Sequence, residues 1–283
     1  MIPESPVPTR SRRDLCPGVL RPWLADDGAL VRVRLIGGLV SASELAGLSE
    51  VSRRYGDGDL HLTGRANLQL RAMPHADGLL PSDVVEAIAA TGLLPSRTHE
   101  LARNVMVSPQ TGLVGGRADL RPVAAELDRL LCADPGLADL PGRFLFVLDD
   151  GRGDLSTREP DLGLVVVDAH SAQLRVGSTG WGEVVPLDRA APALVALARR
   201  FLSVRDPGVT APWHVDELAA PLTDDHPRDP RTNVRSDPLP FGPHHLRISD
   251  GVLAPDLVDA LTAAGHDLVV TPWRGVLNTG AQR

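Results

Sequence analysis

Apolar and polar positions near the start of the chain alternate first with the period of a strand and then with that of a helix. Residues 29–35 carry apolar side chains at every second position with arginines between them, which predicts a half-exposed strand. A helix is predicted to begin at Ser41, because Glu44 three residues later completes a capping box. The elements predicted in this stretch are a strand at 29–35, a helix at 41–55, strands at 59–63 and 67–72, and a helix at 82–90. This order is that of a ferredoxin-like α+β unit.

The pattern restarts at about residue 96 and mixes strands with helices. Strand patterns lie at 103–108, 144–148, 162–167 and 172–176, and helical patterns at 120–133 and 190–202. Residues 220–243 are rich in proline and aspartate, as is typical of a linker, and a strand, a helix and a strand follow at 246–248, 255–264 and 268–271. We therefore predict an α+β protein with a ferredoxin-like half-domain at 14–92, a mixed α/β domain at 96–219, a linker at 220–243 and an incomplete second half-domain at 244–283.

An internal repeat relates the two ends of the chain. Residues 59–63 (Asp-Leu-His-Leu-Thr) resemble residues 267–271 (Asp-Leu-Val-Val-Thr), and each pentapeptide follows a predicted helix that ends in glycine. Two copies on either side of a full middle unit predict two half-domains that pair about a pseudo-two-fold axis. The second copy runs only to Arg283, so we expect no room for its final strand and helix.

Charge and composition limit the classes of function. The net charge of −7 disfavours a general nucleic-acid-binding protein, which would need a basic face. All 29 basic residues are arginines, so a site for an acidic ligand must use guanidinium groups. No apolar run is long enough for a membrane span, and the first residues contain no secretory signal. We therefore expect a soluble cytoplasmic protein with neither nucleic acid nor membrane as a partner.

Metal ligands are scarce in the sequence. Cys16 and Cys132 are far apart and cannot supply the four thiolates of an iron–sulfur cluster, so we expect ordinary free thiols. His244 and His245 are adjacent, and adjacent side chains on a strand point to opposite faces, which disfavours one shared ion. We therefore predict no metal site from these residues.

Arginines and amides recur at three places. Side chains at every second position of a strand share one face, and one such face is predicted to carry Thr63, Arg65, Asn67, Gln69 and Arg71. Arg32 and Arg34 share a face of the first strand, and Arg103 and Asn104 precede a Val-Met-Val strand. Together these donors suit a ligand with several carboxylates. The alternative is a set of ordinary polar residues on half-solvated sheets.

These segments resemble the nitrite/sulfite reductase superfamily, and within it the precorrin-3B synthase family. Residues 62–70 are similar to the Thr-x-Arg-x-Asn-x-Gln segment of the superfamily's half-domain. Residues 34–38 are similar to its Arg-Leu-Pro-Gly-Gly segment, with Ile36 in place of proline. Residues 103–109 resemble the segment that opens the haem and cluster domain. The further segments that are similar to the precorrin-3B synthase branch are 16–18, 140–144, 149–154 and 271–274.

The resemblance implies ferredoxin-like half-domains of the nitrite/sulfite reductase type around a mixed α/β domain of the haem/cluster type. It also implies a polycarboxylate tetrapyrrole as ligand, with contacts from Arg34, Thr63, Arg65, Asn67, Gln69, Arg71, Arg103, Asn104 and Arg143. The cofactors expected for the family are a 4Fe-4S cluster and an iron/siroheme-type centre. In precorrin-3B synthases the tetrapyrrole is the substrate precorrin-3A. The implied activity is that of a monooxygenase of aerobic cobalamin biosynthesis, which hydroxylates precorrin-3A and forms a lactone.

Two departures from the family bear on function. Arg143 and Leu145 stand where sulfite reductases carry lysines, which disfavours sulfite or nitrite as the substrate. The family's cluster cysteines would follow residue 274, and the sequence reaches Arg283 without them, so we expect a C-terminally truncated chain. A separate chain would then carry the cluster cysteines. The alternatives are a non-catalytic tetrapyrrole-binding subunit and an inactive remnant.

Overall fold

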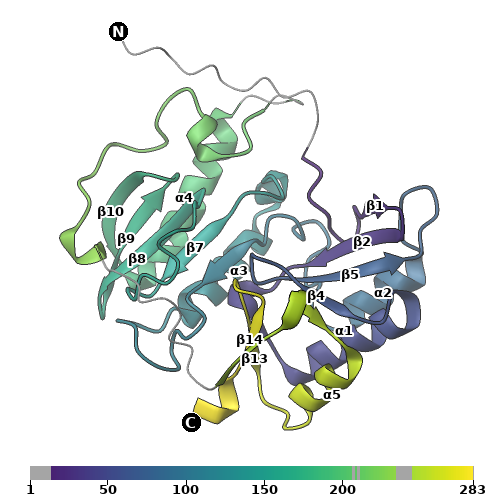
Figure 1. Ribbon diagram of the computed structural model, residues 1–283. Coiled ribbons are helices and arrows are strands. Elements are labelled where there is room, and N and C mark those ends of the chain that lie inside the picture. Colours follow the sequence, from purple (N-terminus) through teal and green to yellow (C-terminus); the bar gives the residue numbers. More distant parts are fainter. Residues whose placement is uncertain (1–13, 206–207, 209–210, 234–243, 283) are drawn as a thin grey trace.

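The structure is a computed structural model that describes residues 14–205, 208, 211–233 and 244–282 (Figure 1). Figure 1 shows two bodies side by side, one containing α1, α2 and α5 and the other containing α4 and the strands β7 to β10. The yellow β13 and β14 lie between them, so the end of the chain returns to its beginning. This mixture of sheets and helices confirms the predicted α+β class.

The first body is built on two antiparallel sheets. One has the strand order β1-β2-β5-β4-β12, with the bounds Trp23–Ala25, Gly28–Val33, Leu68–Met73, Leu60–Leu62 and Val252–Leu253. The other has the order β11-β14-β13-β3, with the bounds His245–Arg247, Gly275–Asn278, Leu268–Thr271 and Leu39–Val40. The helices α1 (Ala42–Tyr55), α2 (Ser82–Ala90) and α5 (Pro255–Thr262) share one apolar core with both sheets. The predicted capping box is present at the start of α1, where Ser41 accepts from the Glu44 amide.

Each half gives a two-residue strand to the sheet of the other half. The strand β3, from the first half, pairs with β13, and β12, from the second half, pairs with β4. Each of these strands follows a short 3-10 turn that ends in a glycine of positive φ, 75° at Gly38 and 72° at Gly251. The reciprocal exchange confirms the pseudo-two-fold arrangement that the repeat predicts.

The prediction that the second copy has no room for its final strand is wrong. β13 turns through residues 272–274 into β14, with a register from Leu268 opposite Asn278 to Thr271 opposite Gly275. The strand is short and begins with glycine, and both features weaken a strand pattern in sequence. The second copy therefore has the same strand, turn and strand as β4 and β5.

The second body is a five-stranded sheet with helices on one face. Its order is β10-β9-β8-β7-β6, with the bounds Gly180–Pro186, Ser171–Val176, Leu162–Asp168, Phe146–Asp149 and Val105–Val107, and the last three strands are parallel. The helices α3 (Arg121–Ala133) and α4 (Leu187–Val204) cover the face that carries Phe146, which shares a core with Phe201. On the other face, Leu145 and Val147 pack with Trp273 from the turn between β13 and β14. This contact attaches the second half-domain to the central sheet.

The five helices lie where the pattern of apolar and polar residues predicts them. The same pattern did not predict several short or irregular strands. The strands not predicted are β1, β3, β10, β12 and β14. The short 3-10 helices that complete the described chain are Ile36–Gly38, Pro135–Asp139, Val215–Glu217, Pro230–Thr232, Ser249–Gly251 and Thr279–Gln282. No helix in the described ranges is long and apolar enough to cross a membrane.

Part of the predicted linker lies against the central sheet. The Gln173 side chain of β9 donates to the Pro227 carbonyl at 2.9 Å and accepts from the Asp229 amide at 2.8 Å. Residues 234–243 of the predicted linker lie outside the described residues. The boundaries between the proposed domains stay a prediction.

Candidate functional site

Three of the predicted ligand-binding side chains hold one short segment of the central body. The Arg34 guanidinium donates to the Gly142 carbonyl at 3.3 Å, and the Arg65 guanidinium donates to the Arg143 carbonyl at 2.9 Å. The Asn104 amide donates to the Phe144 carbonyl at 3.2 Å. These contacts fix residues 142–144, one residue before β7, so this segment joins the first body to the central sheet.

Asn67 and Asn104 form a buried bridge at the same joint. The Asn67 amide nitrogen donates to the Asn104 amide oxygen at 3.2 Å, and the Asn67 oxygen accepts from the Leu35 backbone at 2.9 Å. The two residues are only 1% and 2% exposed. Their polar groups are therefore engaged within the protein, and we do not count them as direct ligand contacts.

The five alternating polar residues do not share one strand face. Residues 63–67 form a turn between β4 and β5, closed by a hydrogen bond from the Thr63 amide to the Asn67 carbonyl at 2.9 Å. The Thr63 hydroxyl accepts from the backbone amides of Arg65 and Asn67, and Ala66 has a φ of 57°. The predicted alternation is wrong here, because the period-two rule applies only within a continuous strand.

The remaining predicted residues lie apart or are already paired. Gln69 accepts from Arg32 at 3.4 Å on neighbouring strands. Arg71 lies 3.4 Å from the Asp27 carboxylate and is partly exposed. Arg103 makes a two-point contact with Asp128 of α3, at 2.6 and 3.0 Å. The charges of Arg71 and Arg103 are therefore already matched by carboxylates.

Four other guanidinium groups gather without such a partner, and we call Arg32, Arg34, Arg65 and Arg143 the arginine cluster. Within the described ranges no carboxylate lies at ion-pair distance from any of them. Burial lowers the pKa of Arg34 to about 10, with repulsion from Arg32 as the next cause. Burial also lowers the pKa of Arg65, and Arg143 and Arg32 both contribute repulsion there. A partly desolvated group of like charges of this kind gains stability from a bound anion.

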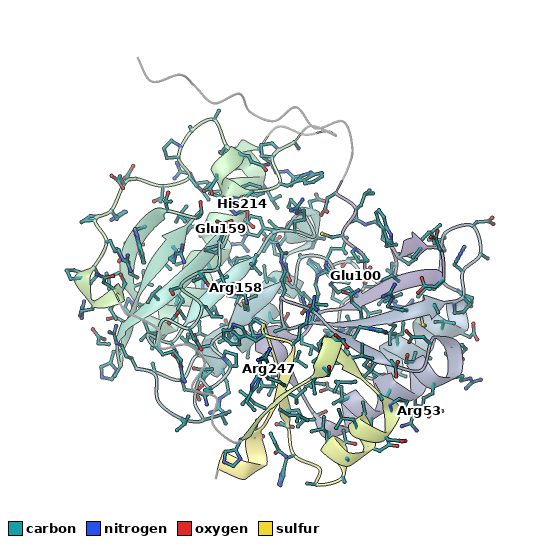
Figure 2. The ribbon with its side chains drawn as sticks, viewed as in Figure 1. Arg53, Glu100, Arg158, Glu159, His214 and Arg247 are labelled. Atoms are coloured by element: carbon teal, nitrogen blue, oxygen red, sulfur yellow. The ribbon has the colours of Figure 1, made fainter. Side chains whose placement is uncertain are left out.

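The N-terminal segment 14–20 forms one wall of this site. The buried Glu100 carboxylate accepts from the backbone amides of Val19 and Leu20, and Figure 2 shows Glu100 where the two bodies meet. Arg34 holds the same segment by donating to the Pro17 carbonyl at 3.2 Å. Gly142 makes the close approach possible, because a Cβ there would lie 2.8 Å from the Cys16 Cβ.

A cavity of about 240 Å³ opens beside the cluster. Its lining comprises Asp14, Leu15, Cys16, Pro17, Trp23, Arg32, Arg143 and Trp213. A second cavity of about 450 Å³ follows the edge strand β6, between α3, β3 and β13, and its lining includes the paired Arg103 and Asp128. Each cavity therefore contacts the arginine cluster, the smaller one through Arg32 and Arg143 and the larger one through Arg34.

The loop 211–218 brings further residues to the cluster that were not predicted from the sequence. Trp213 lies under the Arg143 guanidinium, 5.6 Å from the ring centre. His214 lies 3.7 Å from the buried Asp161 carboxylate, whose pKa burial raises to about 6. Figure 2 shows His214 in the second body. The one sequence feature that could have indicated Trp213 is that tryptophan is rare, with four in the chain.

The cysteines do not fit an iron–sulfur cluster. Such a cluster needs four thiolates, and the chain has only Cys16 in the N-terminal wall and Cys132 in α3. The described residues also contain no group of three or more histidine, cysteine, aspartate or glutamate side chains that could hold a metal ion. The cluster that the resemblance implies cannot be assembled from these residues alone.

Replacing Asn67 with leucine should destabilise the protein by about 2–4 kcal/mol, because the Leu35 amide and the Asn104 oxygen would lose their partner while buried. Urea unfolding measures this change. Gln69→Leu is the control on the next strand, and it should change stability by less than about 1 kcal/mol because its one contact is long and half-exposed. Equal effects of the two variants would show that the buried bridge is not what joins the two bodies.

Comparisons with known proteins show what parts of this chain are similar to. Residues 24–77 match the family described as "Nitrite/Sulfite reductase ferredoxin-like half domain". The chain is 31% identical over 141 residues to precorrin-3B synthase of Sinorhizobium sp, which covers 50% of this chain and 29% of that protein. It is 30% identical over 122 residues to ferredoxin–nitrite reductase of Leptolyngbya laminosa, which covers 41% of this chain and 23% of that protein. The matched regions thus span less than a third of either curated relative.

A solved structure extends the likeness in fold. The NirA protein of Mycobacterium tuberculosis superposes with a TM-score of 0.57 and 18% identity, over 95% of this chain and 57% of NirA. The chain therefore contains a nitrite/sulfite reductase ferredoxin-like half-domain, shares the fold of NirA, and is related to the oxidoreductases precorrin-3B synthase and ferredoxin–nitrite reductase.

Proposed function

We propose that this chain acts in aerobic cobalamin biosynthesis as a precorrin-3B synthase-like oxidoreductase that binds a polycarboxylate tetrapyrrole, precorrin-3A, at the arginine cluster. The observation that carries the proposal is the group of four guanidinium groups with no carboxylate at ion-pair distance in the described ranges. The similarity to precorrin-3B synthase supports the identity of the ligand.

The chain's own residues would bind and orient the tetrapyrrole. Arg65 and Arg143 can each offer a planar pair of N–H donors to a carboxylate, which fixes both position and angle. Arg34 lies behind them and adds positive charge in a partly desolvated place, where an ion pair is stronger than in water. A siroheme or iron–sulfur centre of the family would supply the redox chemistry, but the cysteines of this chain would not hold such a cluster. The thiolates for such a cluster would come from outside this sequence.

A second candidate is a tetrapyrrole-binding subunit without redox chemistry. The presence of only two cysteines, in separate parts of the fold, favours it. The two candidates differ in turnover, which can be measured on the purified chain after cluster reconstitution. Conversion of precorrin-3A by the chain alone would exclude the binding subunit.

Arg143→Ala should weaken binding of an octacarboxylate tetrapyrrole such as uroporphyrin by roughly 10–100-fold, the effect of losing one charge-assisted contact. The titration is followed by visible absorbance. Arg143 is exposed and its carbonyl contact with Arg65 survives the change, so the variant should fold. Arg53→Ala is the matched control, since Arg53 pairs with Asp259 on the outer side of the first body (Figure 2).

The proposal fails if uroporphyrin does not bind, or if Arg53→Ala weakens binding as much as Arg143→Ala does. Affinity should also fall as salt is added, because the contact is ionic and partly exposed.

A further inference from the structure

One buried carboxylate ties together two segments at the edge of the arginine cluster. The Asp161 Oδ2 atom accepts a hydrogen bond from the Leu145 amide at 2.8 Å, and its Oδ1 atom accepts from the Val215 amide at 3.0 Å. Leu145 directly follows the segment 142–144, and Val215 belongs to the loop 211–218. The Asp161 amide also donates to the Leu145 carbonyl at 2.9 Å, which fixes the aspartate beside β7. A single side chain therefore joins the two segments.

These two segments carry groups that meet in the cluster. Arg143 comes from the first segment and Trp213 from the second, and the guanidinium lies 5.6 Å from the centre of the indole ring. Both residues line the cavity of about 240 Å³. The Trp213 amide donates to the Glu217 carboxylate at 2.7 Å, which closes the loop into a turn. The position of Arg143 therefore depends on the loop, and the position of the loop depends on Asp161.

The strength of this joint depends on the charge of Asp161. The residue is 1% exposed, and a buried carboxylate is costly unless donors stabilise it. Burial raises the pKa of Asp161 to about 6, whereas His214, whose Nε2 atom lies 3.7 Å from Oδ1, lowers it. Hydrogen bonds to an ionised acceptor are about twice as strong as those to a neutral one. Asp161 therefore binds the two amides strongly when it is ionised and weakly when it carries a proton.

Other charged groups surround Asp161, but they do not reverse this effect. Those on the neighbouring segments are Arg65, Arg143, Arg158, Glu159, Arg175, His214, Asp216 and Glu217. Burial has the largest effect on the pKa of Asp161, followed by His214 and the two amides, and Arg65 has a smaller effect than any of these. The negative charge of Asp161 therefore acts on the site mainly through the position of the two segments and only weakly through the Arg65 charge.

We propose that Asp161 is a positioning residue for the anionic ligand of the arginine cluster, and that its carboxylate places Arg143 and Trp213 by accepting from the Leu145 and Val215 amides. The choice of ligand rests on the proposed function. Asp161 acts through the backbone of the two segments, because the lining of the cavity does not include it. Protonation of Asp161 weakens both contacts, so the affinity of the site depends on the protonation of a group that the ligand does not touch.

The first test needs no ligand. NMR of the intact chain records the amide proton shifts of Leu145 and Val215 from about pH 5 to about pH 8. Both shifts should move with one midpoint near pH 6, because both amides donate to the same carboxylate. Asp161→Asn should abolish both movements, and His214→Gln should raise the midpoint, since the His214 charge lowers the pKa of Asp161. Two different midpoints, or movements that survive in Asp161→Asn, would overturn the inference.

The second test titrates the chain with uroporphyrin at about pH 7.5 and about pH 5.5. Val215→Pro removes one amide that Asp161 binds, at the first position of a 3-10 helix and after an extended residue, where proline is tolerated. This variant and Asp161→Asn should each bind about tenfold more weakly at the higher pH, the effect of losing one charge-assisted hydrogen bond. Asp168→Asn is the matched control, because Asp168 lies at the far end of β8 and pairs with Arg231 on the surface.

The pH dependence distinguishes positioning from a general loss of structure. The unmodified chain and Asp168→Asn should lose affinity on going to the lower pH, whereas Asp161→Asn should keep only the dependence that comes from the ligand's own carboxylates. The inference is overturned if Asp161→Asn binds with the affinity and pH dependence of the unmodified chain. If that variant does not fold, equal affinities of Val215→Pro and the unmodified chain overturn it. Failure of the proposed function is a different result, since uroporphyrin would then bind none of these chains.

Discussion

Gly38→Ala should destabilise the protein by about 3 kcal/mol or more, the upper range for a forced overlap in a packed site. A Cβ at Gly38 would lie 2.0 Å from the Val270 carbonyl oxygen, which is backbone of β13 and cannot rotate away. The residue also has a φ of 75°, which alanine adopts at a further cost. The change would separate β3 from β13, one of the two exchanged strands. Urea unfolding followed by circular dichroism measures the loss.

Gly58→Ala separates the collision from the backbone strain. Gly58 has a φ of 92°, and a Cβ there would meet nothing within 4 Å. Only the strain applies, so the expected loss is about 1 kcal/mol. Similar losses at Gly38 and Gly58 would contradict the close approach of the two half-domains at β3.

The helices could be predicted from sequence because their signals are local. The Ser41 and Glu44 capping box lies within four residues, and the structure shows both of its hydrogen bonds. The exchanged strands β3 and β12 have two residues each, so no alternation can develop. Their positions depend on partners about two hundred residues away in the chain, as with Val40 opposite Leu268 and Val252 opposite His61. The repeat predicted the symmetry but not this exchange.

In the candidate site, too, the residue types could be predicted from the sequence. The groups to which these residues donate their hydrogen bonds could not. Arg34 and Asn104 bond to carbonyls of residues 142 and 144, and Arg103 bonds to Asp128 on the next helix. Ala66 has a positive φ, which alanine rarely adopts. The sequence therefore did not indicate the turn that interrupts the predicted strand face. The cluster could only be identified once each arginine's partner was known.

The pseudo-symmetry explains why the two hairpin turns play different parts. The repeat aligns Thr63 with Thr271 and therefore Arg65 with Trp273. Arg65 bonds to the Arg143 carbonyl and belongs to the cluster, whereas Trp273 packs on Leu145 of the same sheet. One scaffold thus gives a polar turn that bonds to the segment 142–144 and an apolar turn that packs on the central body. A protein built on two copies can specialise each copy in this way without changing the backbone.

The protein should lose stability between about pH 4 and pH 7, because Asp154 holds a proton in the folded state. Its side chain is 8% exposed, its Oδ2 atom has no hydrogen-bond partner, and Ser108 donates to its Oδ1 at 2.7 Å. Burial, and next to it repulsion from the Asp149 carboxylate, raise the pKa of Asp154 from 3.8 to about 7. The folded state therefore binds the proton more tightly than the unfolded state.

The sign of the effect follows from this difference in proton binding. Below about pH 4 both states hold the proton, and the contribution of Asp154 is fully present. As the pH rises to about 7, the unfolded state loses its proton first, so the free energy of unfolding falls. The total fall is up to about 4 kcal/mol, since each pKa unit corresponds to about 1.4 kcal/mol.

Asp154→Asn should flatten this dependence, because the amide does not titrate and still accepts from Ser108 through its oxygen. Urea unfolding at a series of pH values from 4 to 8 gives the slope for each variant. Glu183→Gln on β10 is the control, since Glu183 is exposed. A slope that survives in Asp154→Asn would assign the effect to another group such as Asp161, whose pKa burial raises to about 6. A slope lost in Asp154→Asn alone would establish that the buried aspartate loop after β7 is what makes the central body sensitive to pH.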